Sequence, residues 1–387
     1  MTGMLLAPRT TSDTFVSAAR AAAEPAARDA ARADRERRLS ADVVAALVEA
    51  GFSRALVPAR HGGTAIGFTT LTEAVAAVGE GCASAAWTGS LLAYTARFAA
   101  YLPAEGQAEI WADGPDSRLV SSLVSTSAGA VPADGGWRLS GTWTYASGVE
   151  FSDWALLMAM VPGADERQEA RFFAVPRAAY RIEETWDTVG MRATGSHTVA
   201  VDEVSVPAHR TFLMDDMFTG RGAVSDELRH FQPLFAVNGL TFAAPVLGAA
   251  RGALKLSERA LADKAARGAE PAESQRIAHA RAAGEIDAAG LLLARAALSA
   301  DRERVTEDVL VRNRRDCALA TQLLVGAVDT LFRAAGTRGQ SASDPLQRIW
   351  RDANSAASHM VLQFEPAALA YTRGPLDAAR AGKSPRS

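Results

Sequence analysis

The chain has 387 residues, of which 48% are hydrophobic and 22% are charged, and its formal net charge is −3. This balance is typical of a folded globular enzyme, and it lacks the basic excess needed to bind a nucleic-acid backbone. Cys82 and Cys317 are the two cysteines, too few for a disulfide framework or a cysteine zinc site. No run of about 18 apolar residues is free of charge, so we expect no membrane span and a cytoplasmic protein.

The first part of the chain is predicted to be helical. Ser40 is placed to cap a helix that ends before Gly51, because Ser favours the N-cap and Gly the position after a helix. Two further helices are expected over residues 69–79 and 83–101. We assign residues 1–116 to an N-terminal helical domain.

The middle of the chain contains short segments rich in β-branched and aromatic residues, separated by Gly, Pro, Asp and Ser. A turn is predicted at residues 133–136, which read Ala-Asp-Gly-Gly. We expect an antiparallel sheet or barrel in a domain spanning residues 117–228. Its predicted strands cover residues 118–125, 137–145, 154–161, 171–175 and 198–206.

The last part of the chain, residues 229–387, is predicted to form a bundle of four long helices. In the second of them, small and apolar residues recur at helical spacing and predict close contact with a neighbouring helix; they are Ile277, Ala280, Gly284, Ala288 and Leu291. The four expected helices span residues 245–267, 273–300, 305–335 and 345–371.

Several common catalytic motifs are missing. The sequence has no G-x-G-x-x-G after a strand, no P-loop, no G-x-S-x-G elbow and no helical histidine pair with metal spacing. We therefore expect no nicotinamide site, no metal site, and neither hydrolase nor kinase chemistry. An enzyme with this sequence has to bind its cofactor by another route.

Two segments resemble the acyl-CoA dehydrogenase superfamily. Residues 186–199, Trp-Asp-Thr-Val-Gly-Met-Arg-Ala-Thr-Gly-Ser-His-Thr-Val, are similar to its Gly-Met-Arg-x-Thr-x-Ser segment. Residues 345–353, Pro-Leu-Gln-Arg-Ile-Trp-Arg-Asp-Ala, resemble its final-helix Arg-Asp-Ala motif. The likeness extends over residues 12–375 and implies an α+β fold with N-terminal helices, a central antiparallel β-domain and a C-terminal four-helix bundle.

Within that superfamily, the sequence is most similar to two-component flavin-dependent monooxygenases, including p-hydroxyphenylacetate hydroxylase and aromatic polyketide hydroxylases. Residues 143–149, Trp-Thr-Tyr-Ala-Ser-Gly-Val, resemble their flavin-facing Trp-x-x-x-Ser-Gly segment. The dehydrogenases often carry a catalytic glutamate at the position of Met360, and methionine cannot take a proton. The monooxygenases place a histidine where His359 stands.

The resemblance implies an oxygenase component that receives reduced FMN or reduced FAD from a separate NAD(P)H:flavin reductase. Molecular oxygen would be the co-substrate, and a C4a-hydroperoxyflavin would hydroxylate an aromatic, polyketide-like small molecule. Such a site has to exclude water. The flavin would supply the oxidation, while the protein supplies binding and hydrogen bonds.

The resemblance also implies site residues. His359 and Ser147 are the predicted catalytic residues, because a histidine with an ordinary pKa near 6.5 can deprotonate a phenol. A core histidine and a plain Ser-Gly turn are the alternative interpretations of these two positions. The predicted cofactor contacts are Trp143, Tyr145, Ser147, Thr194, Ser196 and Arg338, the last near the flavin of a neighbouring subunit.

The predicted substrate contacts come from the two helical regions. Thr95 stands where many relatives carry a second histidine, which argues against phenol hydroxylation by a pair of histidines. His197 is expected to have a structural role. The predicted substrate-binding residues are Tyr94, Thr95, Phe98 and Phe235.

Three other functions remain open from the sequence. They are N-oxygenation of an amine or amino sugar on the same scaffold, an acyl-CoA dehydrogenase-like flavin dehydrogenase, and a non-catalytic flavin-binding scaffold. The missing glutamate argues against the dehydrogenase. Because bundles of this kind bury helix faces between subunits, we expect a homotetramer, or at least a dimer.

Overall fold

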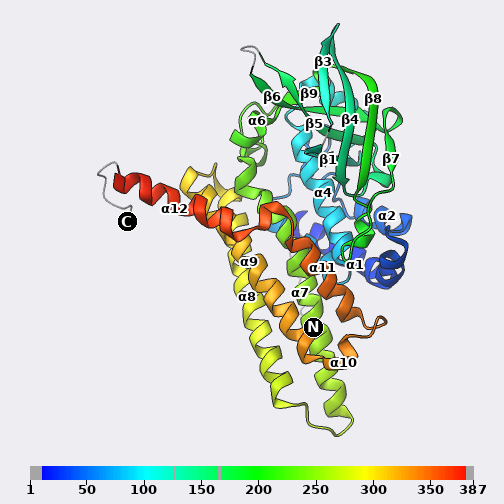
Figure 1. Cartoon of the computed structure of the whole chain (residues 1–387), viewed down its shortest axis with the longest axis vertical. Coiled ribbons are helices and arrows are strands. Elements are labelled where there is room, and N and C mark those ends of the chain that lie inside the picture. The colour runs from blue at the N-terminus through cyan, green and yellow to red at the C-terminus, as the bar shows by residue number, and fades with distance from the viewer. Residues whose placement is uncertain (1–10, 126, 164–166, 381–387) are drawn as a thin grey trace, which may run out of the picture.

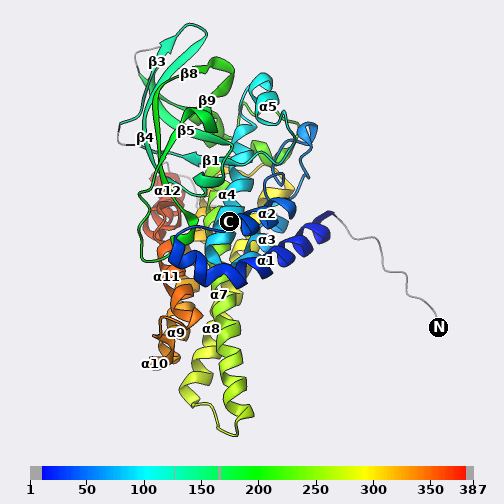
Figure 2. The ribbon, with the colours of Figure 1, turned by 90° about the vertical axis from the view of Figure 1, so that its right-hand side faces the viewer.

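The computed structural model describes residues 11–125, 127–163 and 167–380. The sheet occupies one end of the molecule, and the longest helices run from it to the other end (Figure 1). Figure 2 shows the N-terminal helices lying beside the bundle, next to the sheet. These N-terminal helices are α1 (Thr11–Glu36), α2 (Ala41–Glu49), α3 (Phe68–Gly79), α4 (Ala83–Ala99) and α5 (Ala104–Ile110).

The capping residues expected from the sequence are in place. The Ser40 hydroxyl accepts a hydrogen bond of 3.4 Å from the Val43 N–H at the start of α2. Gly51 follows that helix with a φ of +100°, a conformation that favours glycine. Helix α4 is buried along nearly all its length, since small residues let its neighbours approach from every side.

Over the described residues the central sheet has nine strands, and most of its pairs are antiparallel as predicted. The differences are β1, which pairs in parallel with β5 along its whole length, and β3, which pairs in parallel with β5 at Gly129. Three short strands, β3, β7 and β9, were not predicted. The strands are β1 (Leu119–Ser122), β2 (Val124–Ser125), β3 (Gly129–Ala133), β4 (Gly136–Ala146), β5 (Trp154–Pro162), β6 (Gln168–Pro176), β7 (Arg181–Glu183), β8 (His197–Pro207) and β9 (Thr211–Leu213).

The C-terminal helices differ from the prediction at two points. Helix α7 begins at Leu234 and passes through Pro245, where we expected it to start. The fourth predicted helix is broken into α11 and α12, and His359 lies in the break. After α6 (Met214–Thr219), the helices are α7 (Leu234–Ala266), α8 (Glu273–Arg302), α9 (Glu307–Ala334), α10 (Gly336–Gly339), α11 (Pro345–Ala357) and α12 (Phe364–Arg380).

The stripe on α8 that was predicted to contact a neighbouring helix faces outward, so it makes no such contact within the described part of this chain. Ile277 is 60% exposed and Leu291 is 73% exposed. Helix α8 is rich in alanine on every side, so spacing alone does not reveal which side turns inward. The buried side consists of Ala282, Ile286, Ala289, Leu293, Ala296, Ala297 and Ala300.

Two glycines bring α3 and α7 into backbone contact. A Cβ atom on Gly248 would lie 2.6 Å from the Gly79 Cα and 2.3 Å from the Ala76 carbonyl oxygen. Neither distance is compatible with a side chain, so the helices cross without one between them. The N-terminal helices and the bundle therefore share one continuous apolar core.

Two helices, α7 and α9, are long and apolar enough to cross a membrane by length and composition alone. In this fold they are bundle helices. Within the most apolar window, 83% of α7 and 50% of α9 is buried inside the chain. Core helices commonly have this composition, so it is weak evidence for a membrane.

Candidate active site

A cavity of about 670 Å³ lies where the sheet meets the helices. Its walls come from α4, the start of the sheet, the loop before β8, helix α7 and the break between α11 and α12. The described residues that line it are aromatic, aliphatic, hydroxyl-bearing or amide residues and one histidine, with no Lys, Arg, Asp or Glu. The volume and the apolar character are typical of a small-molecule site.

Helix α4 supplies one wall, including three of the predicted substrate residues. Tyr94, Thr95 and Phe98 all line the cavity. The Tyr94 hydroxyl is buried with no hydrogen-bond partner among the described residues, and burial raises its pKa. The Thr95 hydroxyl lies 3.4 Å from the Ser121 hydroxyl, so this position offers a hydroxyl in place of a second histidine.

A row of buried hydroxyls lines another part of the cavity, next to α4. The Ser147 and Ser196 Oγ atoms are 2.7 Å apart, and Ser196 Oγ lies 2.6 Å from Thr194 Oγ1. The Trp87 indole N–H donates to Ser147 over 3.2 Å. Thr194 donates to the Met191 carbonyl over 2.9 Å. The structure thus brings together three residues that were predicted separately.

His359 stands at the cavity edge in the break between α11 and α12. Its ring stacks on Phe242, with centroids 3.8 Å apart, and meets the Trp87 ring edge-on at 5.8 Å. Its Nδ1 accepts a hydrogen bond of 3.3 Å from the Val361 N–H. Burial lowers its pKa to about 4. The expectation of an ordinary pKa was wrong.

The tautomer of His359 follows from these contacts. Because Nδ1 accepts from a backbone N–H, the neutral ring carries its proton on Nε2. Nε2 has no hydrogen-bond partner within the described part of the chain, and the residue lines the cavity. His359 is therefore a neutral hydrogen-bond donor toward a ligand rather than a ready proton acceptor.

Asp352 on α11 anchors the loop that carries Met191. It accepts a hydrogen bond of 2.6 Å from the Met191 N–H, and Met191 has a left-handed φ of +53°. The Met191 carbonyl also accepts from the Trp186 indole over 3.0 Å. Burial raises the pKa of Asp352 to about 6. The Arg-Asp-Ala motif contains this residue, but sequence reasoning gave it no role.

Two predicted contacts lie elsewhere. Trp143 is fully buried inside the sheet, and its indole N–H donates to the Met158 carbonyl over 2.7 Å. Phe235 turns away from the cavity and stacks on Phe218 with centroids 5.1 Å apart, while its neighbour Leu234 lines the cavity. Neither residue is placed to contact a ligand in the cavity.

Tyr145 and His197 lie close in the chain to the hydroxyl-bearing residues Ser147 and Ser196. Tyr145 is 61% exposed, has a φ of +63° and packs edge-on against Trp186 at the cavity mouth. His197 Nδ1 accepts from the N–H groups of Thr185 and Trp186. Its contacts with the backbone agree with the structural role expected from the sequence.

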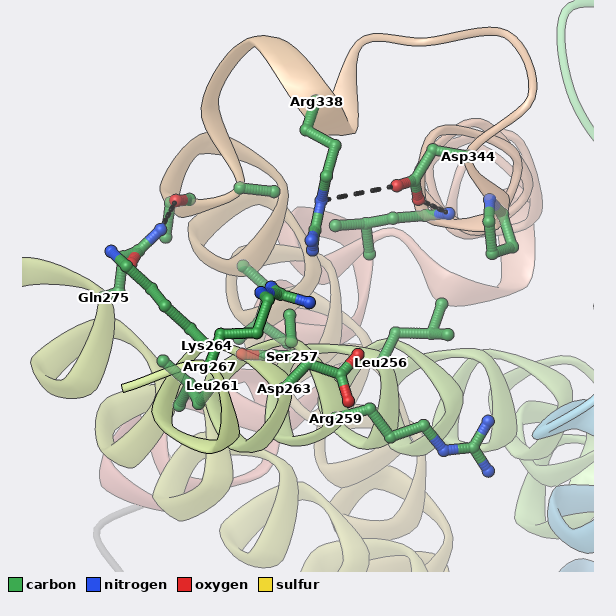
Figure 3. Close-up of a pocket in the computed structure, with 16 residues that line it drawn as sticks. Leu256, Ser257, Arg259, Leu261, Asp263, Lys264, Arg267, Gln275, Arg338 and Asp344 are labelled. Carbon is green, nitrogen blue, oxygen red and sulfur yellow. Dashed lines mark hydrogen bonds and ion pairs between the residues drawn. The ribbon is translucent and has the colours of Figure 1, made fainter. Parts of the chain in front are cut away.

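Arg338, on α10, lies in a separate groove between the bundle helices (Figure 3). The guanidinium Nε is 3.9 Å from an Asp344 carboxylate oxygen, and the side chain is 61% exposed. The groove has a volume of about 450 Å³. Its charged lining residues are Arg259, Asp263, Lys264, Arg267, Arg338 and Asp344.

Comparisons with known proteins identify the family. The model of the acyl-CoA dehydrogenase N-terminal domain matches residues 10–109, and that of the C-terminal domain matches residues 240–364. The oxygenase subunit HsaA of a flavin-dependent monooxygenase from Rhodococcus jostii is 32% identical, covering 87% of this chain and 92% of that one. The chain belongs to the flavin-dependent monooxygenase oxygenase subunits of the acyl-CoA dehydrogenase superfamily.

Other relatives in this family agree. The oxygenase component of the FADH₂-dependent resorcinol hydroxylase from a Rhizobium species is 33% identical over 87% of this chain and 88% of its own. The HsaA structure from M. tuberculosis superposes with a TM-score of 0.87, at 27% identity, over 97% of this chain and 99% of that one. XiaF from a Streptomyces species, in complex with FADH₂ and glycerol, gives 0.84 at 28% identity, covering 97% of both chains.

The cavity residues fit the ring system of the flavin that this family uses. Trp87, Trp186 and Phe242 provide aromatic surface, and the hydroxyl row offers polar atoms along one edge. The unpartnered Nε2 of His359 provides a donor. Among the described residues, no group of three His, Cys, Asp or Glu side chains is arranged to hold a metal ion.

Proposed function

We propose that this oxygenase component hydroxylates an uncharged aromatic small molecule, using molecular oxygen and flavin that a separate reductase has reduced. The observation that carries the substrate class is the lining of the cavity, in which no described residue bears a charge at neutral pH. A carboxylate or ammonium group of a substrate would be buried there without a partner, which would cost roughly several kcal/mol of binding free energy. Reduced flavin, when bound, supplies the activation of oxygen.

The residues of the chain perform the remaining tasks. Ser147, Ser196 and Thr194 bind the polar edge of the ring system. His359 donates from Nε2 to an oxygen atom in the reaction centre, where developing negative charge benefits most from a fixed donor. The aromatic surfaces of Trp87 and Phe242 exclude water from the cavity, which would limit the release of hydrogen peroxide without hydroxylation.

The absence of acidic lining residues favours hydroxylation over N-oxygenation. An amine substrate is protonated at neutral pH, and the described lining has no carboxylate to pair with it. KijD3, whose structure contains FMN and an amino-sugar nucleotide, shares the fold at 19% identity. This likeness of fold carries no substrate information for the present chain.

The test compares matched substrates. The purified chain is supplied with FAD, a flavin reductase, NADH and oxygen, together with a phenol or the same phenol carrying a ring carboxylate. We expect hydroxylated product from the neutral phenol and at least tenfold less from the carboxylated one. Equal turnover of both, or a preference for the acid, would contradict the substrate class. Oxidation of NADH coupled only to reduction of oxygen to hydrogen peroxide, for every substrate in a broad phenol panel, would favour the flavin-binding scaffold.

The remaining proposals concern assembly and location. We propose a homotetramer because α8 exposes apolar side chains, including Ile277, Leu291 and Leu298. Arg338 then contacts the flavin phosphate of a neighbouring subunit, and the chain resides in the cytoplasm. Light scattering after size-exclusion chromatography tests the assembly, and a monomer at micromolar concentration contradicts it.

A further inference from the structure

The buried hydroxyls of Ser147, Ser196 and Thr194 form a continuous chain between two fixed ends. At one end, the Trp87 indole is a donor only, and its N–H points at Ser147 over 3.2 Å. At the other end, the Met191 carbonyl is an acceptor only, 2.9 Å from Thr194 Oγ1. The intervening oxygen–oxygen distances are 2.7 Å and 2.6 Å.

Only one arrangement of protons satisfies every contact in this chain. Each hydroxyl has a single proton to donate. Thr194 gives its proton to the Met191 carbonyl, so Ser196 has to donate to Thr194, and Ser147 has to donate to Ser196. Any reversal would leave two oxygens less than 3 Å apart with no proton between them.

We propose that the Met191 carbonyl, acting through Thr194 and Ser196, turns the Ser147 proton away from the cavity, so that Ser147 meets the flavin only as a hydrogen-bond acceptor. Thr194 and Ser196 are in this sense positioning residues for Ser147. The inference rests on the proposed function, because it requires the flavin ring to lie against this wall with its N5 atom facing Ser147.

The consequence is selectivity for one oxidation state of the flavin. The N5 atom carries a proton in the reduced ring and only a lone pair in the oxidised ring. An acceptor-only hydroxyl pairs with the reduced ring and opposes the oxidised ring with a second lone pair. Because an unmatched buried polar contact costs more than a matched one contributes, the wall favours reduced flavin.

The experiment uses Thr194→Val, which keeps the shape of the side chain and removes its hydroxyl. Ser196 is then free to donate to Ser147, and the Ser147 proton turns to the cavity. The dissociation constants of oxidised and reduced FAD are measured anaerobically, together with the midpoint potential of the bound flavin. We expect the preference for reduced FAD to fall about tenfold in the variant, and the potential to fall with it.

Two further variants separate this mechanism from a general disturbance of the site. Thr194→Ser keeps a hydroxyl and should retain the preference of the original chain. Ser196→Ala interrupts the same chain at another residue and should lower the preference like Thr194→Val. Thermal unfolding identifies any variant that has not folded. If Thr194→Val or Ser196→Ala fails to fold, the flavin preference of the remaining one of these two variants tests the inference.

The outcomes distinguish the two levels of inference. If the unmodified chain binds neither form of FAD nor FMN, the proposed function fails, and this inference fails with it. If the unmodified chain binds flavin but both variants that lack a hydroxyl keep its preference for the reduced form, the proton-ordering inference is overturned and the proposed function stands.

Discussion

The two hollows of the molecule differ in the physics that they offer a ligand. The cavity beside the sheet has no charged lining among the described residues, whereas the groove of Figure 3 gathers three arginines and a lysine with two aspartates. In the cavity, recognition depends on the direction of individual hydrogen bonds in apolar surroundings. In the groove, it depends on charges that salt screens over about 8–10 Å. Variants in the two places should therefore respond differently to salt and to small changes of geometry.

The largest effect is expected at His359, because the contribution of this residue to the cavity depends on a single directed hydrogen-bond donor. His359→Ala should lower kcat for hydroxylation by about 10²–10³, as loss of one preorganised donor commonly does. His359→Gln keeps an N–H donor and should recover a substantial part of that loss. Product formation under single-turnover conditions measures both. If Gln were as inactive as Ala, the donor role would give way to that of a base.

The next largest effect concerns Asp352, the buried carboxylate behind the cavity wall. Its pKa is about 6 in the folded chain against an ordinary value of 3.8, so between these values the folded state binds more protons than the unfolded state. The free energy of unfolding should therefore fall as the pH rises from about 4 to about 6, by about 3 kcal/mol from this group.

Urea unfolding of the original chain and of Asp352→Asn across this pH range measures that contribution. Asn keeps an oxygen that accepts the Met191 N–H, but it does not ionise, so the fall should disappear from its profile. His359 acts in the opposite sense, because its lowered pKa makes stability rise between pH 4 and 6.5. If the difference in unfolding free energy between the original chain and Asp352→Asn did not vary with pH, the pH dependence could not be assigned to Asp352.

The smallest effect is expected in the groove. Arg338→Ala should weaken FAD binding about tenfold at low salt, since charge-assisted hydrogen bonds to phosphate contribute about 1.5–3 kcal/mol. That difference should shrink at 0.5 M salt, whereas the loss caused by His359→Ala should not. Titration of FAD at the two salt concentrations measures the loss at Arg338, and single-turnover product formation at the same concentrations measures the loss at His359. If Arg338→Ala weakened FAD binding equally at high salt, the predicted difference in salt dependence between the cavity and the groove would be contradicted.

The sequence predicted the order of helices, sheet and bundle, and eight of the residues that it singled out line the cavity: Tyr94, Thr95, Phe98, Tyr145, Ser147, Thr194, Ser196 and His359. Segments 143–149 and 186–199, far apart in the chain, were each matched to the family, and the structure brings Ser147, Thr194 and Ser196 within hydrogen-bond distance. Nothing local in the sequence indicated that the indole of Trp87 would donate to Ser147. Such a contact is a property of the packing of α4 against the sheet.

The errors came from the orientation of side chains. Trp143 and Tyr145 should share a face of a regular strand, but the register shifts between Trp143 and Ala146, and the left-handed φ of Tyr145 turns its side chain to the cavity mouth. Leu234 and Phe235 are neighbours on α7, and apolar character does not show which of them points inward. The break at His359 had a local signal that was missed, because Pro366 stands in the first turn of α12 and cannot donate the backbone hydrogen bond that an unbroken helix would need there.

The crossing of α3 and α7 has a consequence for the evolution of substrate size. Gly79 and Gly248 set how closely the two helices approach, and α7 carries Asn238, Thr241 and Phe242 along the cavity. A methyl group at either glycine would push α7 aside and shift that wall without changing any lining residue. Part of the width of the cavity is therefore determined by two residues that no ligand touches, so a search confined to the lining would overlook them as determinants of substrate range.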